Sequence, residues 1–323
     1  MLDPVTSLSP IDTAFNPEPQ QIGKGSFADV YVLVASRVAF KQVQYEPNTP
    51  QLLAEFEALE HLYATCNPDS FFRLPRPLAY SDPRDARTFR GTAPPESRPF
   101  QTGVTTRTRR PRPLVAPGEF AAFRRPAYAM DRVQALPTQV ATRIREQFYP
   151  ANAPDRGPSL FRLYFGKDYT NARQSRFINT SVFFLDVARY NQVASYPEGI
   201  ADWLPDAQVV AEAMGNMLGR IHSRGGYDGR DIEFVLGGNG YSGFEFYVID
   251  FNQIRKWNGA IEAVGELVDA YRTNDPYFPL ARRGDPVYEE FRNGYRAAYR
   301  ARLDIADAFL SQIEALQITK DSS

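Results

Sequence analysis

Apolar positions divide the chain into a strand-rich first part and a mainly helical second part. Residues 21–43 carry Val, Phe and Tyr in short runs beside an early pair of glycines, which predicts two or three strands joined by tight turns. After them, apolar residues recur every three or four positions, which predicts a helix with Thr49 as N-cap and Pro50 in its first position. The first part is therefore expected to be a sheet with one helix.

The second part combines helical spacing with a few short apolar runs. Two of these runs flank the glycine-rich turn GGNGYSG, which predicts a β-hairpin. Helices are expected at 138–148, 206–223, 259–272 and 286–316, and strands near 126–137, 159–167, 231–238 and 244–251. The order predicts an α+β protein of two lobes. Its expected parts are a flexible arm (1–17), a β-rich N-lobe (18–133) and a mostly helical C-lobe (134–323).

The segment 82–125 interrupts this pattern. It holds ten arginines and far fewer acidic residues, with frequent prolines and little periodicity. This composition predicts a basic loop inserted in the N-lobe. Arginine offers a planar fork suited to phosphate and carboxylate. A GC-rich genome, which favours arginine codons, is the alternative explanation.

Composition excludes several kinds of site. The net charge of −1 implies no bulk attraction to nucleic acid or membrane. One cysteine allows no intrachain disulfide, and two histidines with that cysteine cannot assemble a Cys/His zinc site. The first twenty residues lack the pattern of a signal peptide, and no apolar stretch is long enough to span a membrane. The expected compartment is the cytoplasm.

The first candidate motif lies between the predicted strands. Gly23 and Gly25 permit a close turn over phosphates, although a tight hairpin without a ligand explains them equally well. Lys41 ends an apolar strand, where a lysine can pair with phosphates and with a glutamate of the following helix. The alternative is a simple edge-strand charge. The candidate partners on the helix are Glu55, Glu57 and Glu60.

The second motif follows the helix expected at 206–223. Asp228 and Asp231 come shortly after its end, Glu233 begins the next strand, and Asp250 ends the hairpin. Acidic residues at such positions can serve as general bases or bind cations. For Asp228 and Asp231, capping of turns is the alternative.

The order of these residues resembles the core of protein kinases and aminoglycoside phosphotransferases. The resemblance covers residues 21–272 and implies a protein-kinase-like fold with its hinge at 129–133. It implies that Asp228 stands in the place of the catalytic Asp and Asp250 in that of the metal-binding Asp. Glu233 replaces the expected metal-binding Asn, which places negative charge where a triphosphate would approach.

The four acidic residues therefore predict a pocket that suits a cation better than a triphosphate. A guanidinium or an α-ammonium group would pair well with such carboxylates. The candidate catalytic residues are Asp228, Glu233 and Asp250, and the candidate substrate-binding residues are Asp231, Gly23, Gly25, Lys41 and Glu57.

Several segments also resemble a fungal family whose domain has been labelled as a zinc-finger-protein domain. The resemblance is carried by HSRGGYDGRDIEFVLGG, RQSRFINTSVFF, LFRLYFGK and TNDPYFPL. It implies an arginine-containing cyclodipeptide synthase of secondary metabolism, which condenses arginyl-tRNA with a second aminoacyl-tRNA to cyclo(Arg-Xaa). Neither a cofactor nor a metal is then expected, because the aminoacyl esters are already activated. The implied tRNA-binding residues are Arg107, Arg109, Arg110, Arg112, Arg124 and Arg125.

Two alternatives stay open at this point. An ATP- and magnesium-dependent small-molecule phosphotransferase would use Lys41 and Asp250 on nucleotide. A pseudokinase-like binding module would use the acidic pocket for recognition alone.

Overall fold

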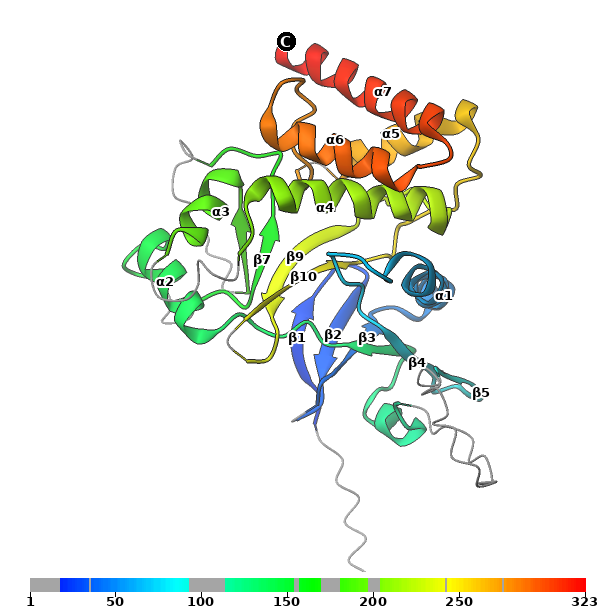
Figure 1. Cartoon of the computed structure of the whole chain (residues 1–323). Helices are drawn as coiled ribbons and strands as arrows, with labels where there is room; N and C mark the ends of the chain where they lie inside the picture. The colour runs from blue at the N-terminus through cyan, green and yellow to red at the C-terminus, as the bar shows by residue number, and fades with distance from the viewer. Residues whose placement is uncertain are drawn as a thin grey trace, which may run out of the picture.

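The computed structural model describes residues 18–34, 36–92, 114–153, 157–169, 181–196, 204–241, 243–274 and 276–323. The expected arm, 1–17, lies outside these residues. The described chain is an α+β protein, as the sequence predicted. It contains two sheets and a group of helices (Figure 1). No helix among the described residues is both long enough and apolar enough to cross a membrane.

The first sheet is antiparallel and has the strand order β1-β2-β3-β6-β4-β5. Its strands are β1 (Gln20–Lys24), β2 (Ala28–Val32), β3 (Val38–Val43), β4 (Pro77–Asp82), β5 (Asp85–Gly91) and β6 (Ala127–Asp131). A 3-10 turn, η1 (Glu46–Asn48), leads into helix α1 (Thr49–Cys66), whose buried residues include Phe56. The ring of Phe56 packs on Tyr80 of β4 and Tyr128 of β6, which fixes the helix against this sheet. The predicted helix is confirmed, but Asn48, not Thr49, is its N-cap.

The arginine-rich segment contains more structure than the expected loop. Part of it forms the edge strand β5, and part forms the 3-10 helix η2 (Pro117–Ala122). Phe120 and Phe123 pack on Phe40 of β3, with ring centroids 5.3 and 4.8 Å apart. The prediction of a structureless loop was therefore wrong for 82–92 and 114–125. In β5, half-buried Thr88 and Phe89 are neighbours between the exposed Arg87 and Arg90, so the strand shows no alternation of apolar and polar residues.

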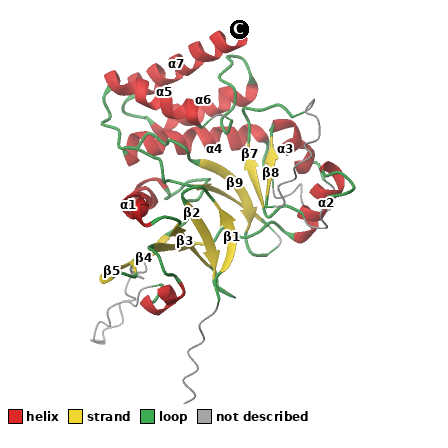
Figure 2. Ribbon diagram, turned by 180° about the vertical axis from the view of Figure 1, so that it is seen from behind, coloured by secondary structure: helices red, strands yellow, loops and turns green. Residues whose placement is uncertain are grey.

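The second sheet has the order β10-β9-β7-β8 and lies between the first sheet and the helices (Figures 1 and 2). Its strands are β7 (Leu160–Leu163), β8 (Val182–Leu185), β9 (Glu233–Gly238) and β10 (Phe244–Ile249). The expected hairpin is confirmed as the antiparallel pair β9–β10. Strand β7 extends it on the other side, and β8 joins β7 in parallel. The pattern along the sequence predicted the hairpin and a strand at β7, but not β8.

The remaining helices lie beyond the second sheet or beside it (Figure 1). They are α2 (Thr138–Phe148), α3 (Val187–Ala194), α4 (Ala207–Arg220), α5 (Val264–Thr273), α6 (Pro286–Ala298) and α7 (Leu303–Asp321), with the π-helical turn η4 (Ile221–Gly225) after α4 and the 3-10 turn η5 (Ile261–Ala263) before α5. Helices α4 and α6 cross closely because Gly215 and Gly294 lie at their contact. A Cβ at Gly215 would lie 1.9 Å from the carbonyl oxygen of Phe291. The positions of α2 and α4 agree with the expected helices, whereas the helix expected at 286–316 divides into α6 and α7.

Candidate functional site

Lys41 stands at the junction of the first sheet and the loop that follows β10. Its Nζ lies 2.6 Å from Glu55 Oε1 on α1 and 2.8 Å from Asp250 Oδ1. The backbone N–H of Phe251 also donates to Glu55 Oε1, at 3.3 Å. Among the three glutamates considered as partners of Lys41, the structure therefore brings Glu55 to it.

The electrostatics of this group are those of a buried ion triad. Burial disfavours the charged form of Lys41, but the carboxylates of Asp250 and Glu55 outweigh it and hold its pKa well above the usual range. Asp250 has φ 65°, a left-handed conformation that a non-glycine residue seldom adopts. Its side chain stays one-third exposed. Strained backbone of this kind gathers at functional sites, where neighbouring contacts hold it in place.

The glycine pair forms the turn above Lys41. The N–H of Gly25 donates to the carbonyl of Ala28 at 3.1 Å, and a Cβ on Gly25 would lie 2.9 Å from that same oxygen. The turn carries Phe27 inward, with its ring centroid 5.8 Å from Lys41 Nζ. Gly23 lies at the bulge between β1 and β2. The structure therefore places both glycines in the hairpin that covers the lysine.

Asp228 occupies a different setting from the one expected for a general base. It is 3% exposed, and both carboxylate oxygens are already engaged. Arg255 Nε donates to Oδ2 at 2.6 Å, and the backbone N–H groups of Arg230 and Arg255 donate to Oδ1. These contacts join the loop before β9 to the loop after β10. The geometry favours an anchoring role for Asp228 over proton transfer.

Glu233 and Asp231 carry two further carboxyl groups that interact with Asp250. Glu233 Oε2 pairs with Arg162 Nη2 of β7 at 2.8 Å. Burial raises the pKa of Glu233 to about 7; Asp250 and Asp231 add to the rise, and Arg162 opposes it. Asp231 has φ 61°, and its pKa is raised by burial and by Asp250. Glu233 can therefore exchange a proton near neutral pH, as a general base requires.

The other predicted residues lie outside this group. Glu57 is exposed and pairs with Arg90 Nη1 at 2.6 Å, so it is not the partner of Lys41. Arg124 is exposed, and Arg125 donates to the carbonyl of Gln44, which ties η2 to the end of β3. The remaining candidate tRNA-binding residues fall outside the described part of the chain: Arg107, Arg109, Arg110 and Arg112.

Three residues of this region were not singled out from the sequence for the roles they have. Arg162 pairs with Glu233, and Tyr277 lies beside them. Asn274 donates to the carbonyl of Gly229 at 2.7 Å and accepts the N–H of Asp231, which fixes the acidic loop. Arg162 interrupts an otherwise apolar strand, and that interruption was the available signal.

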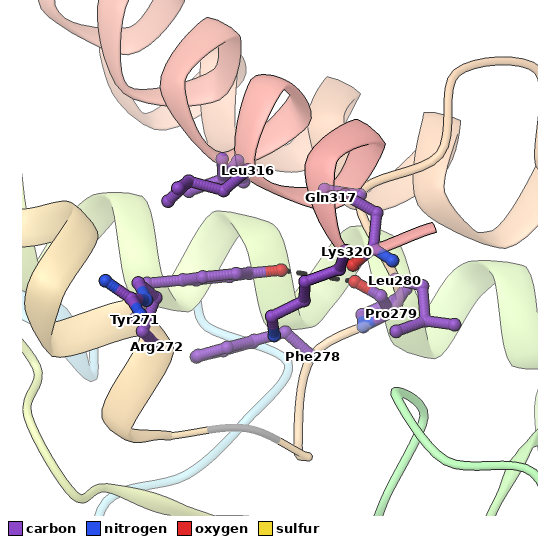
Figure 3. Close-up of a pocket in the computed structure, with 10 residues that line it drawn as sticks. Tyr271, Arg272, Phe278, Pro279, Leu280, Leu316, Gln317 and Lys320 are labelled. Carbon is purple, nitrogen blue, oxygen red and sulfur yellow. Dashed lines mark hydrogen bonds between the residues drawn. The ribbon is translucent and has the colours of Figure 1, made fainter. Parts of the chain in front are cut away.

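Hollows near the site differ in size. A cavity of about 700 Å³ borders the triad and is lined by α1, Gly225–Tyr227 and the loop after β10. A second hollow lies between α5 and α7, beside Tyr271, Phe278 and Lys320, and is only about 30 Å³ in volume; the Tyr271 hydroxyl donates to the carbonyl of Pro279 there, at 3.1 Å (Figure 3). Within the described residues, no three acidic, His or Cys side chains are arranged to hold a metal ion.

One family model matches part of the chain. It covers residues 246–307 and belongs to DUF3669, a family described as "Zinc finger protein". The matched segment contains neither Cys nor His, so the description implies no zinc ligands here. No curated protein matches the chain.

These comparisons correct one expectation from the sequence. The chain was expected to resemble arginine-containing cyclodipeptide synthases as a family. The family model that matches carries no link to those synthases, and no curated relative supplies one. That family assignment is therefore unsupported, and a function must be argued from the site alone.

Proposed function

We propose that the protein is an enzyme whose two parts are arranged as the lobes of a protein kinase. The sheet order β1-β2-β3-β6-β4, with α1 packed on it, corresponds to a kinase N-lobe. A lysine of the third strand pairs with a glutamate of the helix, as in kinases. Asp250 comes from the other part and reaches the same lysine. This correspondence supports a substrate cleft between the sheet and the helices.

We infer that the cleft receives a cationic substrate group. The observation that carries this proposal is an excess of carboxyl groups: Asp231, Glu233 and Asp250 interact with one another. Lys41 is already neutralised by Glu55, and Arg162 by Glu233. A guanidinium or ammonium group would compensate the remaining negative charge and would donate several charge-assisted hydrogen bonds to these carboxylates.

The reaction that fits this cleft is amide formation between two aminoacyl esters. The α-amine of one aminoacyl-tRNA loses a proton to Glu233 and attacks the ester carbonyl of arginyl-tRNA. The ester C–O bond breaks, and the ribose hydroxyl leaves with a proton. A second attack of the same kind closes the ring, forms cyclo(Arg-Xaa) and releases the second tRNA. The esters are already activated, so the reaction consumes no ATP.

An arginine-lined hollow supports RNA as the partner. It has a volume of about 710 Å³ and lies between α1 and the β4–β5 hairpin, with Arg84, Arg87 and Arg90 in its lining. Each of these arginines pairs with a carboxylate at the surface; Arg84 Nη2, for example, lies 2.7 Å from Asp82 Oδ2. Contacts between arginine side chains and phosphate position a nucleic acid without reading its sequence.

The test is the product formed by Glu233→Gln. Extracts of a host that expresses the chain are scanned by mass spectrometry for cyclo(Arg-Xaa) masses absent from the empty-vector control. We expect the variant to form at least about 100-fold less product, because general-base catalysis contributes that much. Glu262→Gln, an exposed acid outside the site, is the matched control. Undiminished product from Glu233→Gln would remove this residue from the mechanism.

A phosphotransferase is the second candidate, and one observation favours it. The Lys41–Glu55 pair and the left-handed Asp250 correspond to the groups with which kinases hold ATP and magnesium. Soluble, folded protein that forms no diketopiperazine but consumes ATP in the presence of a small-molecule acceptor would establish this candidate instead. Ligand binding without turnover would indicate a binding module.

A further inference from the structure

The register of the second sheet brings a cation and a carboxyl group together. Arg162 of β7 lies opposite Val235 of β9. Glu233 is two residues from Val235 and therefore on the same face of the sheet. Its diagonal position lets Arg162 Nη2 reach Oε2 at 2.8 Å. The pair is largely enclosed, since the Glu233 side chain is 15% exposed.

The loop after α5 adds a phenol to this pair. Phe165 N–H donates to the carbonyl of Tyr277 at 3.2 Å, and Gly166 N–H donates to that of Pro276 at 2.9 Å. The approach requires glycine, because a Cβ at Gly166 would lie 2.4 Å from the carbonyl oxygen of Phe278. These contacts hold Tyr277 at the end of β7, and Tyr277 is only 7% exposed there.

The Tyr277 hydroxyl is buried and unsatisfied. It makes no hydrogen bond of ordinary length and angle with the residues that the structure describes, although it lies close enough to Glu233 to stabilise the ionised carboxylate. Its ring meets Tyr164 edge to face, with centroids 4.9 Å apart, and Glu233 is the acidic neighbour that acts most on it. A buried hydroxyl without a partner of good geometry destabilises the folded protein. In enzymes without bound substrate, hydrogen bonds between catalytic groups are often long, and they shorten when the site is occupied.

We propose that Arg162 and Tyr277 are positioning residues for Glu233: Arg162 holds one carboxylate oxygen, and the Tyr277 hydroxyl closes on the carboxylate when Glu233 is ionised. The inference rests on the proposed role of Glu233. The two donors come from different elements, the strand β7 and the loop between α5 and α6. They would aim the free lone pair of the carboxylate at the substrate amine.

The groups around Glu233 act in opposite directions. Burial, Asp250 and Asp231 favour its neutral form, whereas Arg162 and the Tyr277 hydroxyl favour its ionised form. Loss of either donor therefore raises the pKa of Glu233. We expect Tyr277→Phe to raise it by about one unit, because it removes a hydrogen bond to the ionised carboxylate. Arg162→Gln is expected to raise it by about one unit or more, because it removes a charge.

The measurement is the titration of the Glu233 carboxyl carbon by NMR on protein labelled in its glutamate side chains. The resonance is assigned by its disappearance in Glu233→Gln. Tyr288→Phe is the matched control, because its hydroxyl donates to a different glutamate, Glu314, at 2.8 Å. We expect an upward shift with Tyr277→Phe and none with Tyr288→Phe. An unchanged titration in folded Tyr277→Phe protein would overturn the inference.

This experiment separates the inference from the proposed function. The titration is read without any substrate, so a shift in Tyr277→Phe supports the positioning role even if no cyclodipeptide is formed. Where product is formed, the acidic limb of its pH–rate profile must move upward by the same amount. A loss of rate at every pH without that movement would indicate a purely structural role for Tyr277.

Discussion

At the residue scale, Lys41 pairs with two carboxylates that its removal would leave without a cation. It is 7% exposed, and Glu55 is 2% exposed. Lys41→Met is expected to lower the free energy of unfolding by about 3 to 5 kcal/mol, as removal of one partner from a buried pair does. Urea denaturation followed by circular dichroism measures the loss, with the exposed Lys24→Met as control. Adding Glu55→Gln should recover part of the loss; equal stabilities for Lys41→Met and Lys24→Met would contradict the triad.

The same residues mark how far sequence reasoning reaches. The sequence indicated Lys41 and a partner on the next helix, since a lone lysine after an apolar strand and glutamates on that helix are local features. It left the partner open, because Glu55 and Glu57 are only two positions apart and only the packing of α1 decides which one turns inward. Asp228 and Glu233 are only five positions apart, yet Asp228 pairs with Arg255 and Glu233 pairs with Arg162. Those arginines lie far away in sequence, so their choice of partner is a tertiary property.

At the element scale, the C-terminal end of α1 depends on a buried arginine. Arg220, in the last turn of α4, donates to the carbonyl groups of Cys66, Pro68 and Asp69 at 2.6 to 3.1 Å. The Cys66 carbonyl belongs to the last turn of α1 and has no partner within that helix, and those of Pro68 and Asp69 lie just beyond it. Arg220→Met is expected to destabilise the fold by about 2 to 4 kcal/mol.

The control for this prediction lies one turn further along the chain. Arg224 is exposed. Its replacement by Met should change the unfolding free energy by less than about 0.5 kcal/mol. Thermal and urea denaturation of both variants give the comparison. A neutral Arg220→Met variant would show that water satisfies the end of α1 as well as the guanidinium does.

Helices were predictable where apolar residues recur every three or four positions. Helices α2 and α4 follow from their spacing, and Gly226, with φ 66°, ends the helical segment that the glycine pair predicted. Strand β5 contains half-buried Thr88 and Phe89 between exposed arginines, and β8 is completed only by its parallel neighbour β7, so neither leaves a clear pattern of its own. Similarly, Phe120 and Phe123 sit among arginines and prolines, and only their packing on β3 gives them a fixed place.

At the scale of the whole molecule, two buried groups oppose each other in the dependence of stability on pH. His222 is fully enclosed, with hydrogen bonds to the Tyr295 hydroxyl and the Asp228 carbonyl, and burial lowers its pKa to about 3. Its contribution to stability is complete above its unfolded pKa of about 6.5 and is lost as the pH falls toward 3. Glu233 acts the other way. Its pKa of about 7 lies above the unfolded value, so its contribution is complete below about pH 4.3 and is lost as the pH rises through 7.

The two slopes cancel in part between about pH 4.5 and 6.5, where both groups differ in protonation between the folded and unfolded chain. Glu233→Gln removes the opposing term, so its stability should rise more steeply with pH in this range than that of the wild type. His222→Asn removes the other, so its stability should rise less steeply, or fall. Urea denaturation at a series of pH values gives each slope, with Glu262→Gln as the control for a carboxyl lost at the surface. Parallel curves for the wild type and the three variants would mean that neither group changes its pKa on folding. A pKa of Glu233 near 7, on which the proposed chemistry depends, would then be excluded.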